Sequence, residues 1–290
     1  MRSSFFFTLS IVVILFFGFG VGFFSSPLPS SPFFLRPQTI NRNSPLLPGA
    51  MYQVILRQID YVSGKGEFFG VYFHGERNKK KVALTFDADM TTGMRQMLAN
   101  GSVKSFYDDK LISFLVRSRT PATLFLSGLW VEQYPEITKE LSSKSFLEIG
   151  SHSYSHRAYS FPCYALEALP EDRKIEDIGA SQLIIEKYTN KKTRLFRFPG
   201  GCFGPGDLAL LKLAGANAIA WDVVADDGFN SNENSIVGRV VNRVKNGSII
   251  VMHMNGFPNE PVDYLAVPRI VETLKKEGFE FVKVSELLGF

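Results

Sequence analysis

The most distinctive chemical feature of this sequence is a pair of histidines four positions apart, His152 and His156. On a helical turn this spacing places both imidazoles on one face, and neutral imidazoles bind Zn²⁺ and similar ions well. Neighbouring histidines are also common as structural or surface residues. However, the chain has only four histidines and this motif contains two of them. The pattern favours a metal site, to which a carboxylate could add a third ligand.

Two carboxylates, Asp87 and Asp89, follow directly after an apolar run. Beside a cation both would stay ionised unless burial opposes it. One carboxylate can then bind the metal while the other accepts a proton from the water that the metal holds. The alternative interpretation is a pair of ordinary loop or helix-capping aspartates.

Two further segments carry polar groups with a possible catalytic use. Arg197 could hold a catalytic carboxylate through two parallel hydrogen bonds, and the Pro-Gly-Gly turn at 199–201 could direct a backbone N–H at an oxyanion. His253 ends an apolar run and would be a general acid opposite the base, with Asp226 and Asp227 available to orient and charge it. A structural turn with an ordinary salt bridge and a buried core histidine are the competing interpretations.

The segments around these residues predict an α/β fold. From about residue 80 onward, short runs rich in β-branched and aromatic residues alternate with helical patterns, which implies a largely parallel sheet, either a barrel or a doubly wound sheet. The polar residues above follow the strands, whose carboxyl ends would share one mouth. The expected strands are 82–87, 122–127, 147–152, 194–198, 218–224, 249–253 and 279–284. Helices are expected from Pro135 and over about 175–190, 208–215 and 267–278.

The amino-terminal segment predicts export. Residues 1–24 are almost uniformly apolar after Arg2, and about 20 such residues can span a bilayer. The run is longer than a usual secretory core and lacks a good cleavage pattern, so we expect a transmembrane anchor, with a cleaved signal peptide as the alternative. In both cases the remainder is extracytoplasmic, either membrane-anchored or secreted. Residues 25–48 read as a Ser/Pro-rich linker, 49–79 as a lead-in segment and 80–290 as the catalytic domain.

Composition excludes some classes of function. The net charge is only +4, the basic residues are scattered and no nucleic-acid motif is present, so we expect no nucleic-acid partner. The two cysteines, Cys163 and Cys202, are too few for a disulfide framework or a four-cysteine zinc site. An exported chain could join them in one disulfide, and a pair of free thiols is the alternative.

Taken in order, these segments resemble the polysaccharide deacetylases of carbohydrate esterase family 4, which share the NodB-homology domain. The resemblance covers about residues 80–290 and rests on an ordered set of five motifs, found here at 85–89, 152–156, 197–199, 221–227 and 251–253. It implies a distorted (β/α)7 barrel of parallel strands. It also implies metal-dependent hydrolysis of N-acetyl, or O-acetyl, groups on sugars of a cell-wall or extracellular polysaccharide.

The resemblance further implies a role for each matching residue. Asp87 would be the general base, and His152 and His156 would bind a divalent metal, for which we expect Zn²⁺ with another first-row transition metal as the alternative. The family's second aspartate, usually a ligand, is Ala88 here, and we expect Asp89 to replace it. A shift by one residue changes the side-chain direction on an extended backbone.

The remaining roles concern the oxyanion and the leaving group. Arg197 would orient Asp87, the Gly200 amide would bind the oxyanion, and His253 would protonate the departing amine with Asp227 tuning its charge. The family commonly has an aromatic residue where Gly200 stands. Because Ala88 departs from the motif, we keep a second hypothesis, a catalytically inactive, membrane-tethered carbohydrate-binding protein on the same scaffold.

Overall fold

The computed structural model describes residues 67–68, 70–255 and 262–290, which lie in one compact unit, 46–290. The expected membrane segment 1–24 and linker 25–48 lie outside the described residues, as does most of the lead-in segment. None of the helices in the described ranges is long and apolar enough to cross a membrane.

The described strands form one sheet in the order β1-β2-β7-β6-β5-β4-β3-β9-β8, with β10 paired to β3. The pairing of β1 with β2 is antiparallel and the other strand pairs are parallel. The strands are β1 (Glu67–Phe68), β2 (Val71–Tyr72), β3 (Lys81–Ala88), β4 (Ala122–Leu126), β5 (Leu147–Ser151), β6 (Leu195–Phe196), β7 (Asn217–Ile219), β8 (Val223–Val224), β9 (Ile249–His253) and β10 (Glu280–Phe281).

The stretch expected as a single strand at 218–224 changes partners midway. The Ala220 N–H donates to the Tyr72 carbonyl, whereas the Asp222 N–H donates to the Ile249 carbonyl. The first half, β7, therefore pairs with β2 and β6, and the second half, β8, pairs with β9 at the opposite end of the strand order. This short stretch thus contributes strands to two separate parts of the sheet. The sheet is curled and parallel, consistent with the expected distorted (β/α)7 barrel.

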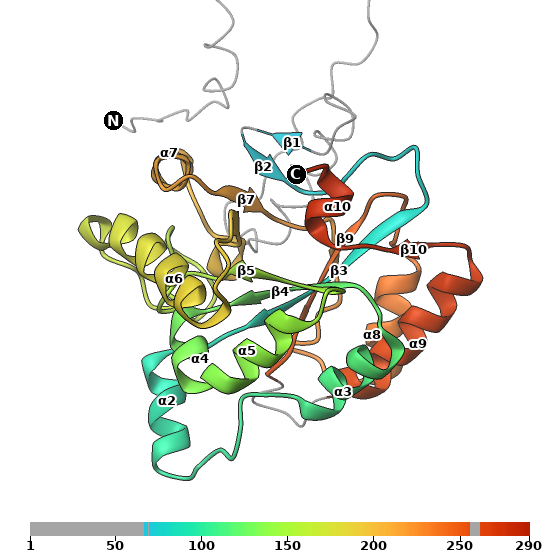
Figure 1. The fold of residues 1–290 in the computed structure, drawn as a ribbon, viewed down its shortest axis with the longest axis horizontal. Helices are drawn as coiled ribbons and strands as arrows, with labels where there is room; N and C mark the ends of the chain where they lie inside the picture. The colour runs from blue at the N-terminus through green and yellow to red at the C-terminus, as the bar shows by residue number, and fades with distance from the viewer. Residues whose placement is uncertain (1–66, 69, 256–261) are drawn as a thin grey trace, which may run out of the picture. The chain divides into compact units, whose positions relative to one another are not determined.

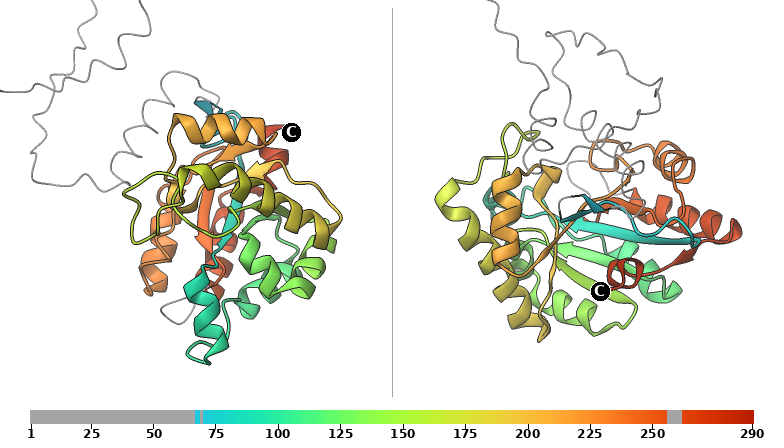
Figure 2. Two further views of the ribbon diagram at one scale, coloured as in Figure 1. Left: turned by 90° about the vertical axis from the view of Figure 1, so that its left-hand side faces the viewer. Right: turned by 90° about the horizontal axis from the view of Figure 1, so that it is seen from above.

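Helices surround the strands, as the views in Figures 1 and 2 show. The four expected helices are α5, α6, α7 and α9, and the other α-helices were not given bounds from the sequence. The apolar face of α2, formed by Met94, Met97 and Leu98, is short and only partly buried. The α-helices are α2 (Thr92–Ala99), α3 (Asp109–Ser118), α4 (Gly128–Gln133), α5 (Pro135–Ser143), α6 (Lys174–Thr189), α7 (Pro205–Leu213), α8 (Glu233–Val241), α9 (Asp263–Lys276) and α10 (Val284–Leu288).

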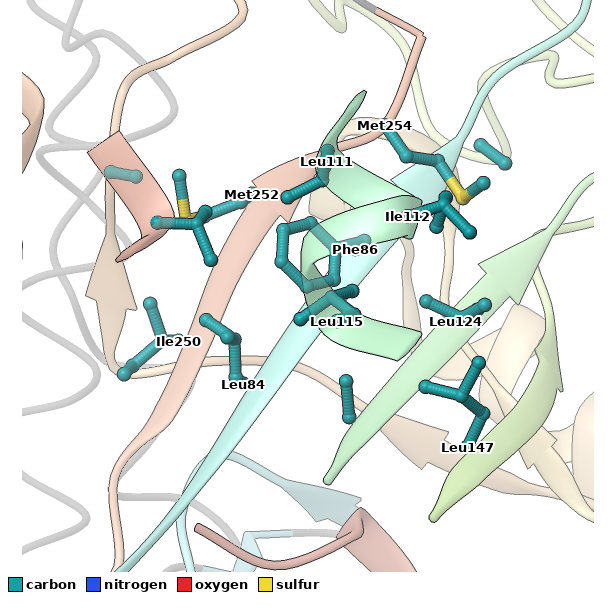
Figure 3. Close-up of a cluster of buried hydrophobic side chains, with 14 of the residues drawn as sticks. Leu84, Phe86, Leu111, Ile112, Leu115, Leu124, Leu147, Ile250, Met252 and Met254 are labelled. Carbon is teal, nitrogen blue, oxygen red and sulfur yellow. The ribbon is translucent and has the colours of Figure 1, made fainter. Parts of the chain in front are cut away.

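The side chains of β3 point alternately to the hydrophobic core and to the candidate site. Successive side chains of a strand point to opposite faces, and here Leu84, Phe86 and Ala88 join the core between the sheet and the helices. Figure 3 shows Phe86 against Leu111 and Leu115 of α3. Each such buried side chain contributes roughly 1.5–3 kcal/mol. The odd-numbered residues of β3 face the interior of the curled sheet, which is where the polar groups gather.

Candidate active site and metal-binding group

The deepest polar contact joins Asp87 at the end of β3 to Arg197, which follows β6. Arg197 is fully buried and its Nη1 donates to Asp87 Oδ1 at 2.7 Å. Arg197 was expected to donate two parallel hydrogen bonds to Asp87, but its guanidinium donates one to Asp87 and the others to different acceptors. Nη1 also donates to Thr85 Oγ1 (2.8 Å), while Nε and Nη2 donate to backbone carbonyls. A buried charge needs such complete pairing, and the result is a fixed orientation for the Asp87 carboxylate.

The two histidines converge, but not on a helix. Residues 152–156 form an irregular turn in which Ser153 and His156 have positive φ values of 64° and 54°. The expected helical turn is therefore wrong. Asp177 of α6 explains the difference, because its carboxylate accepts from the N–H groups of Tyr154 (2.9 Å) and Ser155 (3.2 Å) and fixes the turn from a distant helix.

Asp89 meets both histidines at the mouth of the curled sheet. Its Oδ1 lies 3.4 Å from His152 Nε2 and 3.1 Å from His156 Nε2. One ligand atom from each of the three residues can be chosen so that all lie within 4.8 Å of one another. Burial opposes ionisation of Asp89, but the two imidazoles outweigh it and hold its pKa well below the usual range. Asp87 stands alongside, with Oδ2 3.7 Å from His152 Nε2.

The position of Ala88 explains why Asp89 takes this place. Ala88 is fully buried and packs in the core on the helix side of β3. Asp89 is two residues beyond Asp87, so alternation points both carboxylates toward the same side. The backbone of Asp89 is clamped by Asn255, whose Oδ1 accepts from the Asp89 N–H (3.3 Å) and whose Nδ2 donates to the Asp89 carbonyl (2.6 Å).

The hydrogen bonding of this group fits a cation. His152 Nδ1 lies 2.9 Å from the Arg197 carbonyl, which only accepts, so Nδ1 carries the proton and, in the neutral imidazole, Nε2 presents a lone pair toward Asp89. Asp89 Oδ1 is buried without a hydrogen-bond donor in the described structure. Lone pairs that face one another across about 3 Å repel unless a positive charge lies between them. Two imidazoles and one carboxylate are the donor set of many catalytic zinc sites.

On the other side of the mouth, His253 at the end of β9 is held by Asp227. One carboxylate oxygen of Asp227 accepts from the His253 backbone N–H (2.6 Å) and lies 3.1 Å from Nδ1. Burial lowers the pKa of His253, but Asp227, with Asp89 and Asp87 beyond it, raises the pKa well above its usual value. Asp226, considered beside Asp227 in the sequence, instead pairs with Arg239 of α8 at 2.9 Å.

Gly200 lies in a turn that only glycine fits. Its φ is +62°, and a Cβ there would lie 2.7 Å from the sulfur of Cys163 and 3.1 Å from the Tyr164 ring. Cys163 and Cys202 form a disulfide, so the question left open by the sequence is answered in favour of pairing. The disulfide and Tyr164 occupy the space beside the position where the family commonly has an aromatic side chain. The Gly200 N–H makes no hydrogen bond within the described ranges.

The structure thus brings together seven side chains from distant parts of the sequence, whereas the contacts of Gly200 are with Cys163 and Tyr164. Sequence reasoning missed Asn255 and Asp177, which act on the backbone of Asp89 and of the histidine turn. Asn255 lies two residues beyond the end of β9, the strand that pairs with β3, and extending the register of that pair could have suggested Asp89 as its partner.

Comparison with known proteins identifies the family. The family model for polysaccharide deacetylase matches residues 74–219. A peptidoglycan-N-acetylglucosamine deacetylase from Bacillus cereus is 31% identical over 218 residues, which cover 73% of this chain and 90% of the relative. The chain therefore belongs to the polysaccharide deacetylase family.

Solved structures agree on the fold. The Bc1960 peptidoglycan N-acetylglucosamine deacetylase superposes with a TM-score of 0.65 at 23% identity, covering 76% of this chain and 93% of that one. A CE4 family pseudoenzyme from Bacillus anthracis superposes with a TM-score of 0.61 at 24% identity, covering 75% of this chain and 68% of its own. The same scaffold therefore includes proteins described as deacetylases and one described as a pseudoenzyme.

Proposed function

We propose that this chain is a metal-dependent deacetylase that removes N-acetyl groups from sugars of a cell-wall polysaccharide on the outer side of the membrane. The observation that carries the proposal is the convergence of Asp89, His152 and His156 beside the Asp87–Arg197 pair. Peptidoglycan is the substrate named for the Bacillus cereus relative, which supports both a wall glycan and an extracytoplasmic location.

In this proposal Asp89, His152 and His156 hold a divalent ion, with Zn²⁺ expected. When bound, such an ion polarises the acetyl carbonyl and lowers the pKa of the attacking water. Asp87 Oδ2 takes the proton from that water, and Arg197 keeps the carboxylate aimed at it. Orientation by a buried, fully paired arginine costs nothing at the moment of reaction.

The other groups act on the far side of the acetyl carbon. The Gly200 N–H, which makes no hydrogen bond to another described residue, donates to the developing oxyanion. His253 donates its Nε2 proton to the departing sugar amine, because an amine leaves poorly without that proton. Asp227 supports this step by keeping the imidazole charged and its Nδ1 side engaged.

An exposed aromatic pair supports a sugar substrate. Tyr164 and Phe229 are 52% and 75% exposed, and their rings stack with centroids 5.8 Å apart. Tyr164 adjoins Gly200, and Phe229 follows Gly228, which lies against the His253 ring. Exposed aromatic rings beside such a site offer apolar faces for the C–H face of a pyranose ring.

The test measures acetate release by the full-length chain, stripped of metal and then reloaded, from acetylated chito-oligosaccharides and from peptidoglycan. We expect activity only with metal and a large loss in Asp87→Asn and in His253→Ala. Equal acetate release by Asp87→Asn would remove that residue from the role of base. Tight glycan binding without turnover in any metal would favour the inactive carbohydrate-binding protein, the hypothesis that Ala88 motivates.

A further inference from the structure

Three carboxyl groups are buried together near His253. Asp263 begins α9 and Asp108 caps α3, and each is only 4% exposed. The side chain of Asp227 is 1% exposed. Carboxylates are seldom buried without a cation or hydrogen-bond donors, so the way in which this group is neutralised has consequences for His253.

Hydrogen-bond accounting shows where a donor is missing. Asp227 Oδ2 is engaged by the backbone and ring of His253, but Asp227 Oδ1, Asp263 Oδ1 and Asp108 Oδ2 are buried without a donor in the described structure. The carboxyl group of Asp263 lies within hydrogen-bonding reach of Asp227. Two ionised carboxylates in such contact repel strongly, and a single proton between them would turn the repulsion into a hydrogen bond.

A cation does not explain the pair equally well. Among the described residues, the group that could hold a metal is Asp89 with the two histidines, and it includes none of these three carboxyl groups. The charges that act on Asp263 are the negative Asp227 and Asp108 and the positive His253. His253 already faces Asp227, which leaves Asp263 without a cation of its own among the residues that the structure describes.

We propose that Asp263 is a neutral carboxylic acid near neutral pH and that it donates its proton to Asp227, which in turn holds His253. Its protonation is consistent with a buried carboxyl beside Asp227: burial, then that charge, raises the pKa of Asp263 to about 9, although His253 lowers it. Its position in the first turn of α9 would normally favour ionisation, and burial overrides this.

The consequence concerns the strength of the general acid. A proton from Asp263 satisfies the second oxygen of Asp227 and withdraws part of its charge from His253. An ionised Asp263 would instead add a second negative charge and hold the proton on His253 more tightly. Asp263 is therefore a positioning residue, which moderates a pKa that Asp227, Asp89 and Asp87 raise. Its catalytic importance rests on the proposed function, whereas its protonation does not.

The first measurement looks for the acid directly. Infrared difference spectra of the zinc-loaded full-length chain near pH 7 should contain the C=O stretching band of a protonated carboxylic acid. The band should disappear in Asp263→Asn and persist in Asp108→Asn, a matched control that makes the same change in the neighbouring carboxyl and keeps an N-capping side chain. Persistence of the band in Asp263→Asn, or its absence from the unaltered chain, would overturn the proposal.

The second measurement is the titration of His253 by NMR. The chain has four histidines, and two of them are proposed ligands, so in the zinc-loaded protein His253 can be assigned by comparison with His253→Gln. Asn mimics the neutral acid, so Asp263→Asn should leave the titration midpoint within about 0.3 pH units. Asp263→Ala removes the donor and should raise it by about half to one pH unit.

If the titration midpoint of His253 fell by about one pH unit or more in Asp263→Asn, this would show that Asp263 is ionised in the unaltered chain and would overturn the proposal. Both measurements read protonation and not turnover. The proposal therefore stands or falls separately from the deacetylase function: a chain that never releases acetate could still show the band and the titration, and an active chain could lack them.

Discussion

The two halves of the site satisfy their buried polar groups in opposite ways. On one half, Asp89 Oδ1 lies 3.4 Å from His152 Nε2 and has no hydrogen-bond donor among the described residues. On the other half, Asp227 holds the backbone N–H and the ring of His253, whose pKa is raised, and the proton proposed for Asp263 would satisfy the second oxygen of Asp227. The proposed metal half therefore needs a cation to satisfy its buried groups, whereas the acid half would satisfy its own within the polypeptide.

This difference teaches how the site tolerates its departure from the family motif. The usual ligand position, Ala88, points into the apolar core, and Asp89 reaches the mouth because it lies two residues beyond Asp87. Asn255 and Asp177, from distant segments, fix the backbones that carry the ligands. The metal half thus depends on support from elsewhere in the fold, and variants should separate it from the acid half.

The largest expected effect breaks the metal half alone. In His156→Ala, acetate release should fall by more than about 10⁴-fold, because water activation and charge stabilisation are lost together. Zinc binding measured by calorimetry should weaken in parallel, and chelation of the unaltered chain should abolish activity until metal is restored. His253→Ala is the control and should keep its zinc; full activity in His156→Ala would contradict the assignment.

Breaking the acid half should depend on the leaving group. His253→Ala should lose about 10²–10⁴-fold in kcat on an N-acetylated oligosaccharide but much less on 4-nitrophenyl acetate, whose leaving group departs without a proton. Because the pKa of His253 is raised, the active acid form persists above neutral pH, and the alkaline limb of the kcat profile should lie above pH 7. Equal losses on both substrates would exclude His253 as the proton donor.

Restoring the family motif should harm this chain. Ala88→Asp places a carboxyl group in the apolar core and should lower the free energy of unfolding by about 3 kcal/mol, measured by denaturant titration. It should not rescue zinc binding in Asp89→Ala, since position 88 faces away from the histidines. Rescue in the double variant would show that the direction assigned to position 88 is wrong.

The clamp on Asp89 should matter for metal affinity more than for stability. Asn255→Ala removes both hydrogen bonds to the Asp89 backbone and should weaken zinc binding by about 10–100-fold. Ser127→Ala is a matched control. It also removes a side-chain hydrogen bond to this backbone segment, because Ser127 Oγ donates at 2.9 Å to the carbonyl of Ala88, the residue before Asp89. Comparable losses of zinc affinity in both variants would mean that local packing, and not the clamp, sets the site.

The smallest effect concerns stability and pH in the acid half. The folded pKa of Asp263 is about 9, whereas an unfolded aspartate titrates near about 3.9. Between these two pH values, the folded state binds a proton that the unfolded state does not. The contribution of Asp263 to the free energy of unfolding therefore falls as pH rises through this range. Asp263→Asn should raise Tm relative to the unaltered chain by several degrees at pH 8 and hardly at pH 4. A constant difference would contradict the assignment.

The sequence predicted the regular parts of this fold well. Continuous apolar runs revealed the strands that carry Asp87, His152 and His253, and the ends of those runs located the mouth. The division of 218–224 into β7 and β8 was not predictable, because it depends on which distant strand each half meets. The α2 helix was missed because it has only 8 residues and its apolar residues, Met94, Met97 and Leu98, are only partly buried against the core.

The site was predicted in composition more than in geometry. The residues of the metal group were named from motif spacing, but the helical turn at 152–156 was wrong because Asp177 imposes another conformation. Asn255 and Asp263 carry no motif of their own. Their roles exist only because Asp89 and Asp227 lie beside them in space, a relation that one sequence does not contain.

The most direct test of the central claim is a crystal structure of the zinc-loaded full-length chain with an anomalous difference map at the zinc edge. We expect one peak within about 2.0–2.2 Å of a carboxylate oxygen of Asp89 and of Nε2 of both His152 and His156. A map without a peak there, or a peak bound by the histidines with Asp89 turned away, would contradict the account.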